Sequence, residues 1–426
     1  ASTSASTSSA HAHSHSHSTA LTAVRDGTFF ESIGRPRFIS APMVDQSSLP
    51  WRMFVRQHGT DLAFAQMMHA RNFKNDKKYR GECVDWDNYR HVSGDPGMEA
   101  QGKTWDSPLI VQLAGDCPET LVAAGQYVHK DVTAVDLNCG CPQRIAKRGN
   151  YGAYLLPQTD LLISCLSALV KNLDCPVTVK IRVLPTERET LDLVRRIEDT
   201  GVSMLTVHGR LVSQSKLFTG PANWDIIRKI KDTLTIPVVA NGGIGCYADA
   251  LECLRITGAD AVMSSEALLE NPKLFSESGD EAFRLEFCRA QIGTVKEFVA
   301  LVDAYPHPRP LNQVMRGHLF KMLFRFLQAD ANRDLQKLLS EGSYRQMVGV
   351  VALLEERLRG VDFDTERAVE RGLCTPAGTG YYMRHRDERA QKRVLSLPRD
   401  RTSGNNGNVG TIGMGMGSEG CVGSMG

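Results

Sequence analysis

Between residues 38 and 265, short apolar runs alternate with amphipathic segments. The runs are nearly continuous in apolar residues, as expected of parallel strands that are buried on both faces. Eight such units in series predict an α/β fold, a (β/α)8 TIM barrel. A doubly wound sheet is the alternative, but it needs a glycine-rich turn after an early strand, and none is present. The predicted strands are Phe38–Val44, Leu62–Met67, Leu109–Ala114, Ala134–Asn138, Val177–Val183, Met204–Gly209, Pro237–Asn241 and Ala261–Ser265.

After Phe275 the pattern becomes helical, which predicts a small all-helical bundle behind the barrel. His318, Lys321 and Arg325 recur at helical spacing and predict a basic face on this bundle; a solvated charged face without a partner is the alternative. Ser343 is expected to cap the last helix of the bundle. The predicted division is a disordered Ser/His-rich tail over 1–35, a barrel over 36–278, a helical domain over 285–360, and a basic, then Gly/Ser/Met-rich tail over 361–426, expected to be disordered.

Composition narrows the class of protein. A formal charge of +2 excludes a generally cationic binder, so a nucleic-acid partner would need local basic patches. No apolar run approaches the roughly 18 residues that span a bilayer, so no membrane association is expected. The 11 cysteines lack framework spacing and fit a reducing compartment. Cys139 and Cys141 have no second pair to complete a zinc site, and no metal is expected.

Polar side chains gather where the predicted strands end. In a TIM barrel the chemistry lies at the carboxyl ends of the strands. Nearly every strand finishes with a group that can hydrogen-bond into the barrel mouth, which predicts a binding site there. The residues at these strand ends are, in order, Met43, Gln66, Gln112, Asn138, Lys180, His208, Asn241, Ser264 and Ser265.

Residues after the seventh and eighth predicted strands suggest a flavin phosphate as ligand. Gly242 and Gly243 follow the seventh strand and let the backbone approach closely with its N–H donors. Ser264 and Ser265 lead into a helix N-terminus after the eighth, and these two loops commonly hold phosphate. Lys180 ends an apolar run and needs an anionic partner, which a reduced flavin would supply. His208 could donate to the ring or to the phosphate.

Cys141 is the candidate proton donor. Gly140 and Pro142 flank it in a tight loop after the fourth strand, which would place the thiol over the cavity. An unperturbed cysteine is mostly protonated at neutral pH and can donate a proton. Cys139 is the alternative candidate, but its side chain points away from the barrel mouth if the strand continues through it. A single cysteine is otherwise most often a small buried hydrophobe.

These motifs, taken together and in order, resemble the tRNA-dihydrouridine synthases from about Arg37 to Leu358. The motifs are Ala41-Pro42-Met43-Val44, the Asn138–Pro142 loop, Val179-Lys180-Ile181-Arg182, Val207-His208-Gly209-Arg210, Gly220-Pro221-Ala222-Asn223-Trp224 and Ala240-Asn241-Gly242-Gly243-Ile244. The resemblance implies a barrel that binds FMN, joined to a helical domain that recognises tRNA.

The resemblance also implies roles for individual residues. Cys141 falls on the catalytic cysteine of the family, which protonates C5 of uracil after a hydride reaches C6; NADPH or NADH is the reductant. Pro42, Met43, Gln112, Lys180 and His208 are expected to line the flavin, and Asn241, Gly242 and Gly243 to hold its phosphate side.

The tRNA side is expected to include Asn138, Lys147, Arg148, Arg182 and Arg210, together with the basic helix face. The basic run Arg384–Arg393 either adds affinity for tRNA or is a solvated tail.

Within the family, residues 143–153 resemble the eukaryotic branch that acts on D-loop positions 16 and 17, whereas Cys139 is similar to the branch acting at 20a and 20b. Ser265-Glu266 departs from the Gly-Arg of bacterial relatives and leaves more of the phosphate binding to backbone N–H groups.

Two alternatives stay open at this point: an FMN barrel that reduces a small pyrimidine, as a dihydroorotate dehydrogenase does, and a tRNA-binding relative without catalysis. The resemblance implies a monomer that binds the D-loop and elbow of tRNA in the cytoplasm, the nucleus or both.

Overall fold

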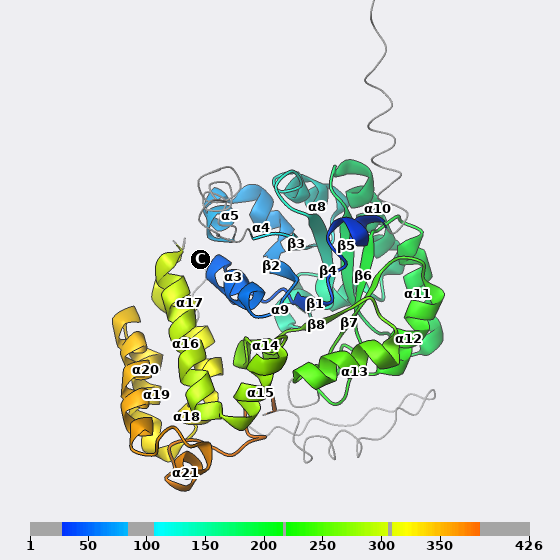
Figure 1. Cartoon of the computed structure of the whole chain (residues 1–426). Coiled ribbons are helices and arrows are strands. Elements are labelled where there is room, and N and C mark those ends of the chain that lie inside the picture. Colours follow the sequence, from blue (N-terminus) through cyan, green and yellow to red (C-terminus); the bar gives the residue numbers. More distant parts are fainter. Residues whose placement is uncertain (1–27, 84–105, 216–218, 306–308, 384–426) are drawn as a thin grey trace, which may run out of the picture.

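The computed structural model describes residues 28–83, 106–215, 219–305 and 309–383. Eight parallel strands close a barrel in chain order, and β8 pairs with β1 (Figure 1). The predicted TIM barrel is therefore confirmed. The strands are β1 (Phe38–Ser40), β2 (Leu62–His69), β3 (Leu109–Ala114), β4 (Ala134–Cys139), β5 (Val177–Arg182), β6 (Met204–His208), β7 (Val238–Asn241) and β8 (Ala261–Ser264).

A short helix closes the amino-terminal end of the barrel. Helix α2 (Thr28–Ser32) buries Phe29 and Phe30 against Ile39, Leu62 and other residues near the beginnings of the strands. Residues 28–35 therefore belong to the folded barrel, and the prediction of a tail over 1–35 is wrong for them. Because this end is plugged, we expect a ligand to enter the barrel from the carboxyl ends of the strands.

Amphipathic helices surround the strands. Helix α11 begins with a capping box between Thr186 and Glu189, and Asn223 caps α12. Their apolar faces lie against the sheet and form one continuous core with the outward-facing strand residues. The helices that follow β1 to β8 include α3 (Leu49–Gln57), α8 (Pro118–Gly125), α9 (Arg144–Arg148), α10 (Thr159–Asn172), α11 (Glu187–Glu198), α12 (Trp224–Thr233), α13 (Tyr247–Thr257) and α14 (Glu266–Glu270).

The long connection after β2 begins with helices. Helices α4 (Ala70–Asn75) and α5 (Lys77–Cys83) occupy its first part. Its remainder, residues 84–105, lies outside the described residues.

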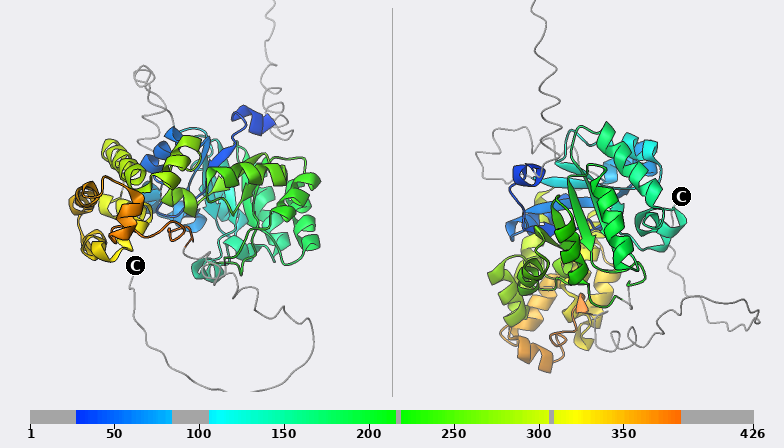
Figure 2. Two further views of the ribbon diagram at one scale, coloured as in Figure 1. Left: turned by 60° about the horizontal axis from the view of Figure 1, so that its bottom comes forward. Right: turned by 90° about the vertical axis from the view of Figure 1, so that its right-hand side faces the viewer.

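A helical domain follows the barrel and lies on one side of it (Figures 1 and 2). Leu319, Met322, Leu323 and Phe326 form a buried apolar stripe in this domain, although the helix breaks between Met322 and Phe324. Ser343 caps the last long helix with a capping box to Gln346, as predicted. The helices are α15 (Glu277–Leu285), α16 (Phe287–Ala304), α17 (Leu311–Met322), α18 (Phe324–Leu327), α19 (Arg333–Glu341) and α20 (Tyr344–Arg359).

The folded chain continues past the predicted end of this domain. Helix α21 (Thr365–Glu370) buries Ala368, and the segment up to Met383 returns towards the barrel (Figure 1). The prediction of a disordered tail from residue 361 is therefore wrong for residues 361–383. The basic run Arg384–Arg393 and the rest of that tail lie outside the described residues, as do residues 1–27.

In the described part of the chain no single helix is long and apolar enough to cross a membrane. One pair, Arg144–Leu155 with Thr159–Asn172, reaches that length and composition only across an 80° bend.

Candidate active site

A cavity of about 610 Å³ opens at the carboxyl ends of the strands. The residues predicted to bind the cofactor all line it, although they come from different strand ends and loops. They are Pro42, Met43, Gln112, Lys180, His208, Asn241, Gly242, Gly243, Ser264 and Ser265. The closed parallel barrel brings them together because every strand ends at the same rim.

Lys180 is a buried cation in the cavity wall. Its Nζ donates to Asn241 Oδ1 at 2.9 Å, and Asn241 Nδ2 donates to the Met263 carbonyl at 2.8 Å, which fixes the amide. Burial, and then the nearby charge of Arg182, lower the pKa of Lys180 to about 8. An anion bound beside Lys180 would compensate for this desolvation, which fits the edge of an anionic ring.

A relay of hydrogen bonds runs through the cavity floor from β4 to the loop that follows it. Asp136 Oδ1 accepts from the Thr178 hydroxyl at 2.7 Å, and Asp136 Oδ2 accepts from Gln112 Nε2 at 2.8 Å. Gln112 Oε1 then accepts from Asn138 Nδ2 at 2.7 Å. Asn138 Oδ1 accepts the backbone N–H groups of Gly140 and Cys141 at 3.1 and 3.0 Å. Because an ionised carboxylate only accepts, it sets both amide orientations and leaves Asn138 Oδ1 facing the loop.

The loop carrying Cys141 is held from two further sides. Arg182 Nε donates to the Gly140 carbonyl at 2.8 Å, and the Ala153 N–H donates to the Cys141 carbonyl at 3.1 Å. Gly152 has a φ of +67°, and a Cβ there would stand 2.8 Å from that carbonyl oxygen, so glycine is needed. The Cys141 backbone is therefore restrained on each side of the thiol.

Cys141 lines the cavity, whereas Cys139 is fully buried in the outer core, as predicted. Burial raises the pKa of the Cys141 thiol, and the Gln143 backbone, Arg182 and Lys180 oppose that shift. The thiol is therefore protonated at neutral pH and can donate a proton. The same two cations would stabilise the thiolate that remains.

Backbone geometry opens the far end of the cavity. Gly242 and Gly243 have φ values of +102° and +85°, which residues with a side chain rarely adopt. The Trp224 Nε1–H donates to the Gly242 carbonyl at 2.9 Å and holds the turn. The Ser264 hydroxyl donates to the Ile244 carbonyl at 3.2 Å and ties the two loops together. This arrangement fits the phosphate end of a flavin nucleotide.

Of the residues predicted on the tRNA side, Asn138, Arg182, Arg210 and Lys321 line the cavity. Arg182 also donates to the carbonyls of Leu211 and Gln214. Arg210 donates to the Gly220 carbonyl at 3.0 Å, and its Nη1 lies 3.1 Å from His208 Nε2. Both guanidinium groups are buried and brace loops around the cavity. Lys147 and Arg148 are exposed on α9, directly after the Cys141 loop.

The prediction that His318 and Arg325 form an exposed basic face with Lys321 is wrong. The His318 side chain is fully buried and stacks on Trp51 of α3, with ring centres 4.6 Å apart. Arg325 lies over the Phe287 ring at 3.8 Å and donates to the Thr375 carbonyl. Both residues hold the helical domain together or attach it to the barrel.

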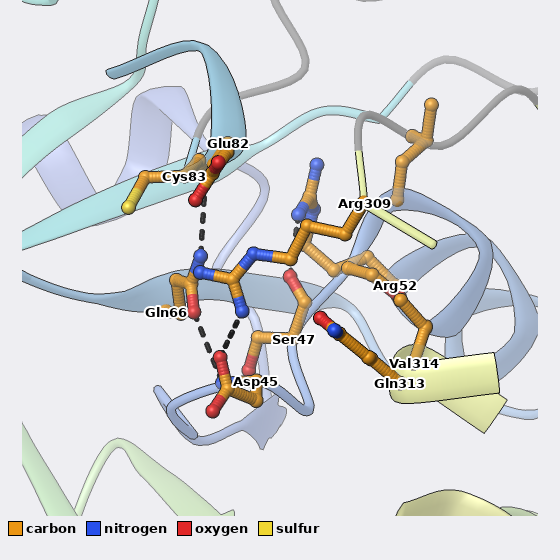
Figure 3. Close-up of a pocket in the computed structure, with 11 residues that line it drawn as sticks. Asp45, Ser47, Arg52, Gln66, Glu82, Cys83, Arg309, Gln313 and Val314 are labelled. Carbon is orange, nitrogen blue, oxygen red and sulfur yellow. Dashed lines mark hydrogen bonds and ion pairs between the residues drawn. The ribbon is translucent and has the colours of Figure 1, made fainter. Parts of the chain in front are cut away.

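Gln66 also lies elsewhere than expected. The β2–β3 register shifts between Phe64 and Met67, which turns Gln66 out of the main cavity. It lines a separate pocket of about 110 Å³, where its Oε1 accepts the Asp45 N–H at 3.0 Å (Figure 3). Arg309 reaches across this pocket to an ion pair with Asp45 (Figure 3). The pocket therefore joins the β1–α3 loop to the beginning of α17 in the helical domain.

The cavity also includes residues that the sequence did not suggest. Tyr381 and Tyr382 line it from the C-terminal segment, and Gln46 lines it beside Lys321. Asp136 is the buried carboxylate at the base of the relay. Asp136 and Asn138 alternate within β4, and this spacing was the available signal for a shared inward face. Among the described residues no group of three or more His, Cys, Asp or Glu side chains is arranged to hold a metal.

The family model described as dihydrouridine synthase matches residues 39–356. The Saccharomyces cerevisiae protein named tRNA-dihydrouridine(16/17) synthase, NAD(P)(+), is 39% identical over 300 residues, which are 70% of this chain and 68% of that protein. The Schizosaccharomyces pombe protein of the same name is 35% identical over 341 residues, or 78% of this chain and 80% of that protein.

Similarity to solved structures is weaker. A 2-naphthoyl-CoA reductase complex aligns with a TM-score of 0.41 and 10% identity, over 57% of this chain and 51% of that one. Morphinone reductase in complex with tetrahydroNAD aligns with a TM-score of 0.39 and 13% identity, over 58% of this chain and 86% of that one.

Proposed function

The chain belongs to the dihydrouridine synthase family, and we propose that it reduces the C5–C6 double bond of uridines 16 and 17 in the D-loop of tRNA. The cofactors we propose are FMN as the bound flavin and NADPH as its reductant. The similar yeast proteins carry both the 16/17 positions and NAD(P)(+) in their names.

One observation carries the proposal: a protonated thiol and a buried ammonium group open into the same cavity. Cys141 and Lys180 both line it, and the charge of Lys180 is close enough to affect the thiol pKa. Reduction of an uncharged double bond needs a hydride for one carbon and a proton for the other. The cavity offers the proton at Cys141 Sγ and a cationic wall against which an anionic ring can lie.

Residues of the chain would bind the flavin and provide the proton. A flavin, when bound, supplies the hydride to C6 of uracil. Lys180 and Asn241 would hold the electron-rich edge of the ring, and the turn at Gly242 and Gly243 would hold the phosphate. Cys141 holds the proton for C5, and Arg182 and Lys180 stabilise the thiolate left behind.

The uridine must leave its stack to reach this cavity, at a cost of about a few kcal/mol that is smallest in a flexible loop. Lys321 at the cavity and Lys147 and Arg148 on α9 would contact the backbone phosphates around it.

Mass spectrometry of tRNA from cells that lack this protein tests the function. We expect uridines 16 and 17 to lose the two added hydrogens while other D-loop positions keep theirs. Purified wild-type protein loaded with FMN should restore dihydrouridine in that tRNA with NADPH. Unchanged tRNA, or a change at 20a and 20b instead, would contradict the assignment to 16 and 17.

A Lys147→Glu/Arg148→Glu variant should bind tRNA several-fold more weakly, and its plot of log affinity against log salt should become shallower by about 1 for each phosphate that the variant no longer binds. The reason is that both side chains are exposed beside the Cys141 loop. The matched control is Lys130→Glu/Lys171→Glu, whose exposed cations follow α8 and end α10 at the opposite, plugged end of the barrel. Equal affinities for the two variants would remove α9 from the tRNA interface.

A further inference from the structure

The C-terminal segment from Cys374 to Met383 returns to the barrel and completes the wall of the cavity. It lies beyond the residues that match the family model, which end at 356. Tyr381 and Tyr382 line the cavity together with residues from most of the strand ends, although they are far from them in sequence. Figure 2 shows this last coloured segment running from the helical domain towards the barrel.

A buried carboxylate on the barrel fastens this segment. The two oxygens of Glu270, at the end of α14, accept the backbone N–H groups of Tyr381 and Tyr382 at 3.0 and 2.8 Å. Glu270 is itself only 7% exposed. A Cβ at Gly380 would overlap this carboxylate, so the chain can approach so closely only with glycine there. Two charge-assisted bonds to one buried acceptor set the position of both tyrosines.

The two tyrosine rings pack against different parts of the molecule. The Tyr382 ring lies against Gly245 after β7, where a Cβ would stand 2.7 Å from ring atom Cε1. The Tyr381 ring meets Phe324 edge to face, with centres 5.7 Å apart. Lys321 Nζ lies 5.5 Å from the centre of the Tyr381 ring and also donates to Gln46 Oε1 at 2.9 Å. An aromatic pair with a cation beside it therefore spans from the barrel rim to the helical domain.

We propose that Tyr381 and Tyr382 form an aromatic wall that receives an unstacked nucleobase of the tRNA loop, with Lys321 beside it for the adjoining phosphate. The inference rests on the proposed function, since it names further substrate contacts of the same site. Single-stranded RNA is recognised by stacking of splayed bases on aromatic rings, with cations along the backbone. We favour a base over the flavin because the Tyr381 ring packs against Phe324 and lies beside Lys321, both in the helical domain, whereas the residues expected to bind the flavin come from the barrel.

Separate measurement of the two halves of the reaction tests this wall. Tyr381→Ala and Tyr382→Ala should take up FMN with the affinity of the wild type, followed by flavin fluorescence, and should be reduced by NADPH at an unchanged rate. Reoxidation of the reduced enzyme by tRNA should lose roughly tenfold in efficiency for each variant, chiefly through a higher tRNA concentration at half-saturation. The Tyr→Phe variants keep the ring and should recover most of that loss.

Two further variants sharpen the test. Glu270→Gln has one oxygen for the two N–H groups, so it should release the segment and reproduce the loss of both tyrosines. Tyr127→Ala, on the exposed surface of the barrel, is the matched control and should behave as the wild type.

Reoxidation of the alanine variants at the wild-type rate would overturn the inference. Weakened FMN binding with normal tRNA saturation would also overturn it, because the wall would then belong to the cofactor. Failure of the wild-type enzyme itself to reduce tRNA would instead count against the proposed function.

Discussion

Replacing Cys141 by alanine is expected to slow dihydrouridine formation by at least about 100-fold, because a positioned general acid contributes roughly 10²- to 10⁴-fold. The variant keeps every residue that lines the flavin side of the cavity, so FMN content and reduction by NADPH should be normal. The measurement is single-turnover reoxidation of the reduced enzyme by tRNA, with dihydrouridine quantified in the product.

Cys139 supplies the matched control for this experiment. It lies two residues away, is fully buried in the outer core, and burial raises its pKa well above the usual range. Cys139→Ala should cost some stability, about 1 kcal/mol for the reduced packing of a small side chain, and leave the rate of reoxidation unchanged. Full turnover by Cys141→Ala would transfer the acid role to another group.

The strand ends show why much of this site could be predicted from sequence. Lys180, Asn241 and Gln112 are polar residues at or near the ends of apolar runs, and a parallel barrel must bring such ends to one rim. The prediction did not need any contact between distant residues, only the period of the pattern and the order of the units.

The contacts of the helical domain could not be predicted in the same way. Helical spacing placed His318, Lys321 and Arg325 on one side, but spacing alone does not say what covers that side. In the structure α3 covers His318 through Trp51, and the segment after α21 covers Arg325 through Thr375. These contacts join segments far apart in the chain, and a single sequence does not carry that information.

The C-terminal wall was missed for a different reason. Residues 361–383 are rich in charged residues and turn formers and have little periodic apolar pattern, which is the signature of a tail. Their order comes from contacts with the barrel, above all the two N–H groups held by Glu270. Leu373, Cys374 and the tyrosine pair were the available signals within that stretch.

A substitution in the relay beneath Cys141 is expected to slow the reaction about as much as loss of the thiol. In Asn138→Asp the side-chain oxygen can still accept the Gly140 and Cys141 N–H groups, but no donor remains for Gln112. Gln112 would then bridge two carboxylates, that of Asp136 and the one introduced by the substitution, and can donate fully to only one of them. We expect the reoxidation rate at neutral pH to fall by about 100-fold, the order of loss that a displacement of about 1 Å in a reacting group can cause.

The sign of the pH dependence distinguishes this relay from simple damage to the fold. Burial raises the pKa of Asp136 to about 6, against the hydrogen bonds from Thr178 and Gln112 and the charge of Lys180. Wild-type activity should therefore decline as the pH falls below about 6, where the acceptor at the base of the relay is protonated. In Asn138→Asp, a single proton shared between the two carboxylates supplies the donor that Gln112 lacks, so activity should rise as the pH falls through that range. The double variant Asp136→Asn/Asn138→Asp exchanges donor and acceptor at the two ends of Gln112, and should recover to within about tenfold of the wild type at neutral pH. An inactive double variant with a normal thermal midpoint, or an Asn138→Asp enzyme as fast as the wild type, would show that the relay does not position the thiol.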